Sequence, residues 1–247
     1  MIKSLEHGFP RRLLAACVLA AMIPVAWSLG DAPAPTPGTG AAAGAGPGAG
    51  AAAGAGAQAS PVDHARLLYN TGIDDVQKAD AFDAAAAAAS TDEGKKAKSA
   101  SDARFYYSAA LAKFQQAVQL DPKMHQAWNY VGYTHRKLGD YDDALAAYEQ
   151  ALALQPGYPE AIEYRAEAFL ALNRIKDAQQ SYLDLFATNR AVASKLLEAM
   201  KTWVASRKGS GGDVAAVNDV DKWVQERAQI AAQTASLTRE GSAASWH

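Results

Sequence analysis

Residues 125–158 read HQAWNYVGYTHRKLGDYDDALAAYEQALALQPGY, and this stretch decides the fold class. On each side of Gly139 and Asp140, bulky and small side chains alternate at a spacing of three or four residues, which is the spacing of one helical face. The two faces consist of Trp128, Val131, Gly132, His135 and Leu138, and of Ala144, Leu145, Tyr148, Ala151 and Leu152. The stretch predicts two antiparallel helices that pack closely where the small residues lie.

The same series recurs on both sides of this hairpin. Downstream it consists of Ile162, Arg165, Ala166, Phe169, Leu172, Asn173, Ile175, Ala178, Tyr182 and Leu185. Upstream only its second helix is in register, with Tyr107, Ala110, Leu111, Phe114, Ala117, Val118, Leu120 and Pro122. A period of about 34 residues with these residue types resembles the tetratricopeptide repeat. The resemblance implies an all-α fold, a short solenoid of about three helical hairpins followed by C-terminal capping helices.

Some positions depart from the family pattern. His135 stands where an aromatic residue is usual, and Arg165, Leu185 and Arg190 replace an aliphatic residue, a small residue and the closing proline. We expect the third hairpin to pack more loosely for this reason.

The first helix of the upstream hairpin does not lie where the period predicts it. Residues 91–101 (TDEGKKAKSAS) are small, polar and rich in lysine, which is typical of a loop. We therefore expect an inserted loop at 91–101 and the missing helix at about 62–89. The register of that helix is left open. The repeats and a capping helix then occupy residues 62–208.

Two amphipathic helices follow the repeats. Residues 191–207 carry apolar side chains at helical spacing, and Gly209 to Gly212 interrupt the chain. A second helix is expected at 213–240, with Val217, Val220 and Val224 on one stripe, and residues 241–247 form a tail. The ends of a solenoid need a cover for their apolar face, so capping is the preferred interpretation. A dimerising helix or a helix lying on a membrane is the alternative.

The amino-terminal segment predicts export. Three basic residues precede an apolar run at 13–29, the order found in a secretory signal. Cleavage is expected after Ser28 or Gly30, and an uncleaved membrane tether through residues 13–29 is the alternative because the run is just long enough to span a bilayer. Residues 1–30 are thus a signal peptide or anchor. We place the protein in the periplasm or cell envelope.

The next segment, 31–61, is rich in Ala, Gly and Pro and predicts a disordered linker. Cys17 is the single cysteine, so the exported part has no disulfide. Removing residues 1–30 takes three basic residues and one acidic residue from totals of 24 and 26, which leaves a net charge of about −4. This charge, with no basic cluster among aromatic residues, argues against a nucleic-acid partner.

No catalytic motif, metal site or cofactor site is expected. The five histidines, His7, His64, His125, His135 and His247, are scattered without the spacing of metal ligands, and no nucleophile motif accompanies them. We expect that the protein is not an enzyme and needs no cofactor.

The resemblance implies that a peptide or protein segment binds in the concave groove lined by the first helix of each repeat. The residues that face away from the hairpin core form a polar to basic stripe beside an acidic one. They are Gln126, Asn129, Tyr133, Arg136 and Lys137 in one repeat, and Glu160, Glu163, Tyr164 and Glu167 in the next. Solvent-exposed charges without a binding role are the alternative for these residues. The lysine and asparagine pattern that clamps a terminal carboxylate in chaperone-binding members is absent.

The sequence therefore predicts an adaptor or scaffold in the cell envelope, bound to another protein through the groove. The alternative is a structural module that forms a homodimer through the C-terminal helices, by way of Val217, Val220, Trp223 and Val224.

Overall fold

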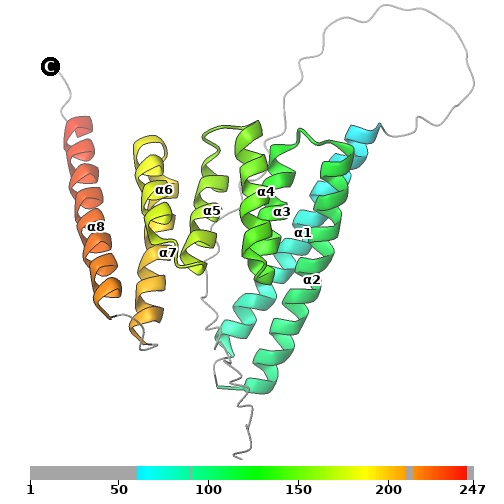
Figure 1. Ribbon diagram of the computed structural model, residues 1–247, viewed down its shortest axis with the longest axis horizontal. Helices are drawn as coiled ribbons and strands as arrows, with labels where there is room; N and C mark the ends of the chain where they lie inside the picture. The colour runs from blue at the N-terminus through cyan, green and yellow to red at the C-terminus, as the bar shows by residue number, and fades with distance from the viewer. Residues whose placement is uncertain (1–59, 90, 210–213, 244–247) are drawn as a thin grey trace, which may run out of the picture.

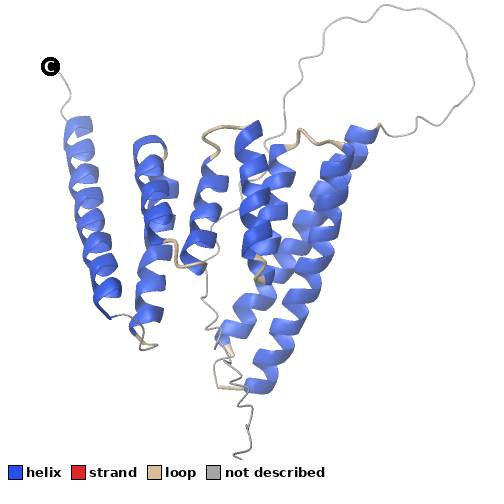
Figure 2. Cartoon of the chain, viewed as in Figure 1, coloured by secondary structure: helices blue, strands red, loops and turns tan. Residues whose placement is uncertain are grey.

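The computed structural model describes residues 60–89, 91–209 and 214–243, and these residues form eight α-helices and no strand (Figure 2). The all-α prediction is confirmed. In chain order the helices are α1 (Pro61–Ala88), α2 (Glu93–Leu120), α3 (His125–Leu138), α4 (Tyr141–Leu154), α5 (Pro159–Ala171), α6 (Ile175–Thr188), α7 (Arg190–Lys208) and α8 (Val214–Ala243).

The helices pack in chain order as a row of hairpins (Figure 1). Pairs α1–α2, α3–α4 and α5–α6 each form a hairpin, α7 packs on α5 and α6, and α8 packs on α7. The turn of the second hairpin is short because Gly139 adopts a φ of 95°, a left-handed conformation that ends α3. Asp140 precedes α4, but its carboxylate lies 3.5 Å from Nδ1 of His135 and makes no hydrogen bond that caps α4.

Each of the first two hairpins contains a close contact between a glycine and an aromatic ring. A Cβ atom added to Gly132 would lie 2.6 Å from the ring of Tyr148, and one added to Gly72 would lie 2.7 Å from the ring of Phe114. Both rings are fully buried. Only a residue without a side chain lets the helices approach this closely. Gly72 is therefore the counterpart of Gly132, which fixes the register of the first helix.

The expected inserted loop at 91–101 is wrong, because α2 begins at Glu93 and runs through this segment without a break. Asp92 caps α2 by accepting a hydrogen bond from the backbone N–H of Lys95 at 3.0 Å. Lysine, alanine and glutamate are good helix formers, and the pair Lys98–Asp102 at 2.8 Å follows helical spacing. The polar composition thus reflects a solvated helix rather than a loop.

The first hairpin is consequently longer than the others. Helices α1 and α2 have 28 residues each, whereas α3 and α4 have 14 each. Figure 1 shows α1 and α2 extending beyond the lower end of α3 and α4.

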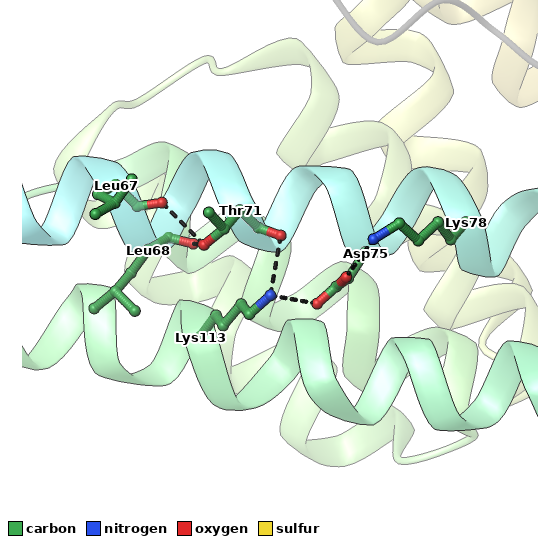
Figure 3. A network of polar contacts seen from close by, with 6 residues as sticks. All are labelled: Leu67, Leu68, Thr71, Asp75, Lys78 and Lys113. Carbon is green, nitrogen blue, oxygen red and sulfur yellow. Dashed lines mark hydrogen bonds and ion pairs between the residues drawn. The ribbon is translucent and has the colours of Figure 1, made fainter.

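A polar network ties α1 to α2 near the middle of the hairpin (Figure 3). Nζ of Lys113 on α2 lies 2.5 Å from Oδ2 of Asp75 and 3.3 Å from the carbonyl oxygen of Thr71, both on α1. Lys78 approaches the same carboxylate at 3.2 Å. Burial works against the charge of Asp75, but the hydrogen bonds from Lys113 and Lys78 hold its pKa below the usual value. The network reinforces the register set by Gly72.

Helices α7 and α8 cover the end of the last hairpin. Leu196 and Met200 of α7 are fully buried, and Nε1 of Trp203 donates to the carbonyl oxygen of Leu170 at 2.9 Å. On α8, the three valines Val217, Val220 and Val224 are buried within the chain. The alternative in which these valines form a homodimer surface is corrected, because the chain's own core already covers them.

Several sequence predictions fall outside the described residues. They are the signal or anchor at 1–30, residues 31–59 of the linker, the first residue of the helix expected at 213–240, and residues 244–247 of the tail. Helix α8 runs to Ala243, beyond the expected end at residue 240. Within the described ranges, no helix combines the length and apolar character needed to cross a membrane.

Candidate protein-binding face

A row of aromatic side chains runs across the first helices of the three hairpins. Tyr69 of α1 lies 5.8 Å from Tyr130 of α3, Tyr130 lies 5.9 Å from Tyr133, and Tyr133 lies 5.2 Å from Tyr164 of α5, all between ring centroids. We call this side of α1, α3 and α5 the first-helix face. All four rings are partly exposed. Burial raises the pKa of Tyr69 to about 12 and raises the pKa of Tyr130, Tyr133 and Tyr164 as well, so the hydroxyls stay protonated.

Between α1 and α3 the row is joined by a polar cluster, which we call the α1–α3 junction. Oδ1 of Asp80 accepts hydrogen bonds from the hydroxyls of Tyr107 at 2.5 Å and Tyr133 at 2.8 Å. Nζ of Lys137 lies 2.6 Å from Oδ2 of Asp83 and 3.7 Å from Asp80. The two carboxylate side chains are 30% and 40% exposed, so water reaches this junction.

A drier ion pair joins α3 to α5, at what we call the α3–α5 junction. Nη1 of Arg136 lies 2.5 Å from Oε2 of Glu167, and these side chains are only 10% and 5% exposed. The guanidinium also lies over the rings of Tyr133 and Tyr164, at 5.2 and 5.5 Å from their centroids. Burial opposes the charge of Arg136, but the carboxylate of Glu167 raises its pKa. Arg136 is thus held by one carboxylate and two aromatic rings.

Glu163 lies one helical turn before Glu167 and has no such partner. The residue is 6% exposed, and no hydrogen bond or ion pair to its carboxylate occurs among the described residues. Burial, and next the charge of Glu167, raise its pKa to about 8, while Arg136 and Lys195 act in the opposite direction. A charged carboxylate that is largely buried and has no ion-pair partner is high in free energy. Binding a proton or a cation would therefore stabilise Glu163.

Asn129 presents a second unpaired group at the corresponding place on α3. It lies 34 residues before Glu163, one repeat earlier, and is 1% exposed. Its Oδ1 is buried without a hydrogen-bond partner. Buried polar atoms of this kind are rare and call for an explanation.

The structure places the nine predicted groove residues in three groups. Some are paired within the chain, two have unpaired polar groups, and the others line the row or its edge. Paired are Tyr133, Arg136, Lys137 and Glu167; unpaired are Asn129 and Glu163; the edge or row holds Gln126, which is exposed, and Glu160 and Tyr164, which are half-buried.

The α1 side of the first-helix face and part of the tyrosine row were not predicted from the sequence. The missed residues are Tyr69, Asp80, Asp83 and Tyr130. Tyr130 could have been found, because it follows Gln126 by four residues and precedes Tyr133 by three on the same helix. The residues of α1 could not, because the register of that helix was open.

Metal chemistry finds no support in this face. Within the residues that the structure describes, no group of three or more His, Cys, Asp or Glu side chains could hold a metal ion. The four tyrosines of the row and the acidic groups form a surface suited to contacts with another molecule.

Two family models described as tetratricopeptide repeat match the chain, one over residues 95–159 and the other over residues 135–199. The first match begins inside the segment that forms the start of α2. Together with the hairpins in the structure, these matches support a tetratricopeptide-repeat protein. No curated protein matches the chain.

Repeats of this class generally mediate protein–protein interaction and scaffolding, and proteins that contain them are typically adaptors without catalytic activity. The partner expected for this chain is therefore another protein or peptide.

Proposed function

We propose that this protein is an adaptor or scaffold of the cell envelope that binds an extended protein segment along the first-helix face. The observation that carries the proposal is the continuous tyrosine row over α1, α3 and α5, with centroid separations from 5.2 to 5.9 Å. Tyrosine offers a large, rigid contact surface with a polar tip, and it is enriched at protein interfaces. A row of such rings fits a partner that lies across several repeats.

The envelope location rests on the amino-terminal sequence. Residues 1–30 have the basic and apolar order of an export signal, and an Ala/Gly/Pro-rich segment follows. Either a cleaved signal or a retained anchor would place the repeats outside the cytoplasm. Cell fractionation of the full chain checks this part: recovery in the cytoplasm with the first residues intact would contradict it.

The binding face can be tested without disturbing its packing. A photo-reactive amino acid such as benzoylphenylalanine replaces Gln126, which is exposed on the first helix α3, or Gln150, which is exposed on the second helix α4. After illumination of cells that carry the full chain, we expect a discrete crosslinked partner from position 126 and none from position 150. Equal crosslinking from both positions, or none from 126, would argue against the first-helix face.

A further inference from the structure

We propose that the bound segment presents a lysine or arginine side chain to Glu163. This inference rests on the proposed function, because it names the chemistry of the partner at the same face. Glu163 of α5 is 6% exposed, forms no ion pair among the described residues, and has further glutamates nearby that add negative charge.

The contrast with Glu167 identifies Glu163 as the receiving carboxylate. Both glutamates lie on α5 and are buried, at 6% and 7% exposure. Glu167 has a partner in Arg136 at 2.5 Å, whereas Glu163 has no ion pair among the described residues. Both glutamates belong to the acidic stripe predicted from the sequence. The structure leaves Glu163 as the one that can accept a cationic side chain.

The charges around Glu163 favour a cation. Glu160 on the same helix and Glu167 add negative charge, and the positive charge of Arg136 is directed at Glu167. Lys195 of α7 is the other basic group that acts on Glu163, but it is exposed and forms no ion pair with it. An incoming ammonium or guanidinium would supply the missing charge-assisted hydrogen bonds.

Tyrosine rings provide a place for the stem of such a side chain. Tyr164 follows Glu163 in sequence. Burial is the main cause of the raised pKa of the Tyr164 hydroxyl, and the negative charge of Glu163 raises that pKa further. The ring of Tyr130 lies 5.8 Å from that of Tyr69 and 5.9 Å from that of Tyr133 on the same face. Aromatic faces attract cations and pack against methylene groups, so the row suits lysine and arginine better than an acidic side chain.

The experiment uses four pools of acetylated and amidated nonapeptides on the immobilised full chain. Each pool has a fixed central residue, either lysine, arginine, norleucine or glutamate, with uncharged mixed flanks. A hydrogen bond to a charged group contributes about 1.5–3 kcal/mol, so we expect the lysine and arginine pools to be retained roughly 10-fold to 100-fold better than norleucine. Glutamate should be retained least.

Three variants assign the effect to a residue. Glu163→Gln keeps the size of the side chain and removes its charge, and it should reduce lysine retention to the level of norleucine. Glu149→Gln removes an exposed carboxylate of α4 and should change nothing. Lys195→Gln removes a competing cation and should raise lysine retention. Circular dichroism of each variant checks that the helices are intact. If Glu163→Gln loses its helices, the inference is judged by whether Lys195→Gln raises the retention of the lysine pool.

The outcomes separate this inference from the proposed function. Equal retention of all four pools, or loss of lysine retention in Glu149→Gln to the same degree as in Glu163→Gln, would overturn the cationic partner and leave the first-helix face as a binding surface. Retention of no pool would also overturn the cationic partner. The proposed function itself fails only if crosslinking from position 126 is absent too.

Discussion

The two junctions on the first-helix face both pair charged side chains between neighbouring helices, but they differ in how far water reaches those charges. The α1–α3 junction has two carboxylates for one lysine, and its acidic side chains are 30% and 40% exposed. The α3–α5 junction has one arginine beside two glutamates, and its ion pair is 10% and 5% exposed. Water can compensate a charge in the first junction but not in the second. Exposure, rather than the number of charges, is therefore expected to decide how much each contact contributes to stability.

The largest effect is expected from Arg136→Met, which leaves Glu167 buried without its cation. Breaking a buried pair in this way costs about 3–5 kcal/mol of unfolding free energy, measured by urea denaturation. The double variant Arg136→Met with Glu167→Leu is the control, because replacing both partners by apolar residues is often neutral. A double variant as unstable as the single one would mean that the arginine acts by packing on Tyr133 and Tyr164.

The second prediction concerns how stability changes with pH, to which Glu163 beside the α3–α5 junction should contribute. Glu163 has a pKa raised to about 8 in the folded chain, compared with 4.5 for the ordinary group. Between these values the folded state holds more protons than the unfolded state, so stability falls as pH rises from about 5 to 8. The slope is at most about 1.4 kcal/mol per pH unit, for one proton.

This pH dependence is measured as the difference between wild type and Glu163→Gln. Burial lowers the pKa of His125, which acts in the opposite direction below pH 6.5, and the subtraction removes its contribution. Glu163→Gln should be more stable than wild type at pH 8 and should approach it near pH 5. Parallel curves for the two proteins would contradict the raised pKa of Glu163.

A smaller loss is expected at the α1–α3 junction from Asp80→Ala. The hydroxyl of Tyr133 loses its acceptor, whereas that of Tyr107 keeps Asp83 at 2.9 Å, and leaving a buried donor unpaired costs about 1–3 kcal/mol. The partial exposure of Asp80 places the result near the lower end of this range. Adding Tyr133→Phe should recover part of the loss in urea denaturation, since the variant no longer carries the orphaned hydroxyl.

The smallest effect is expected from Lys137→Met. Its partner Asp83 is 40% exposed, and ion pairs in contact with water contribute about 0–1 kcal/mol. The loss should shrink further in 1 M salt, which screens the pair. A loss comparable to that of Arg136→Met would contradict the difference between the junctions.

Much of the hairpin architecture could be predicted from the sequence. Gly132 and Tyr148 stand at the positions that the repeat pattern assigns to a close contact, and the structure brings them together. Gly139 marks the turn, with its left-handed φ of 95°. Each of these features depends on a few residues that are close in sequence, so it can be predicted from a short stretch of the chain.

The segment at 91–101 could not be assigned from composition. Its charges satisfy one another at helical spacing, and its few apolar residues give no strong period because most of this helix surface meets water. Because the start of α2 was not recognised as helical, neither the register of α1 nor the roles of Asp80 and Asp83 could be predicted.

Spacing along one or two helices was enough to predict the second and third hairpins, the residue types on their faces and the repeat family that they resemble. Which charges pair with one another became clear only from the packing of the helices. Arg136 meets Glu167 rather than Glu163, and Lys137 meets Asp83 of a helix more than fifty residues earlier. Pairing depends on distances between helices and on the exclusion of water, and neither is encoded in the spacing of a single face.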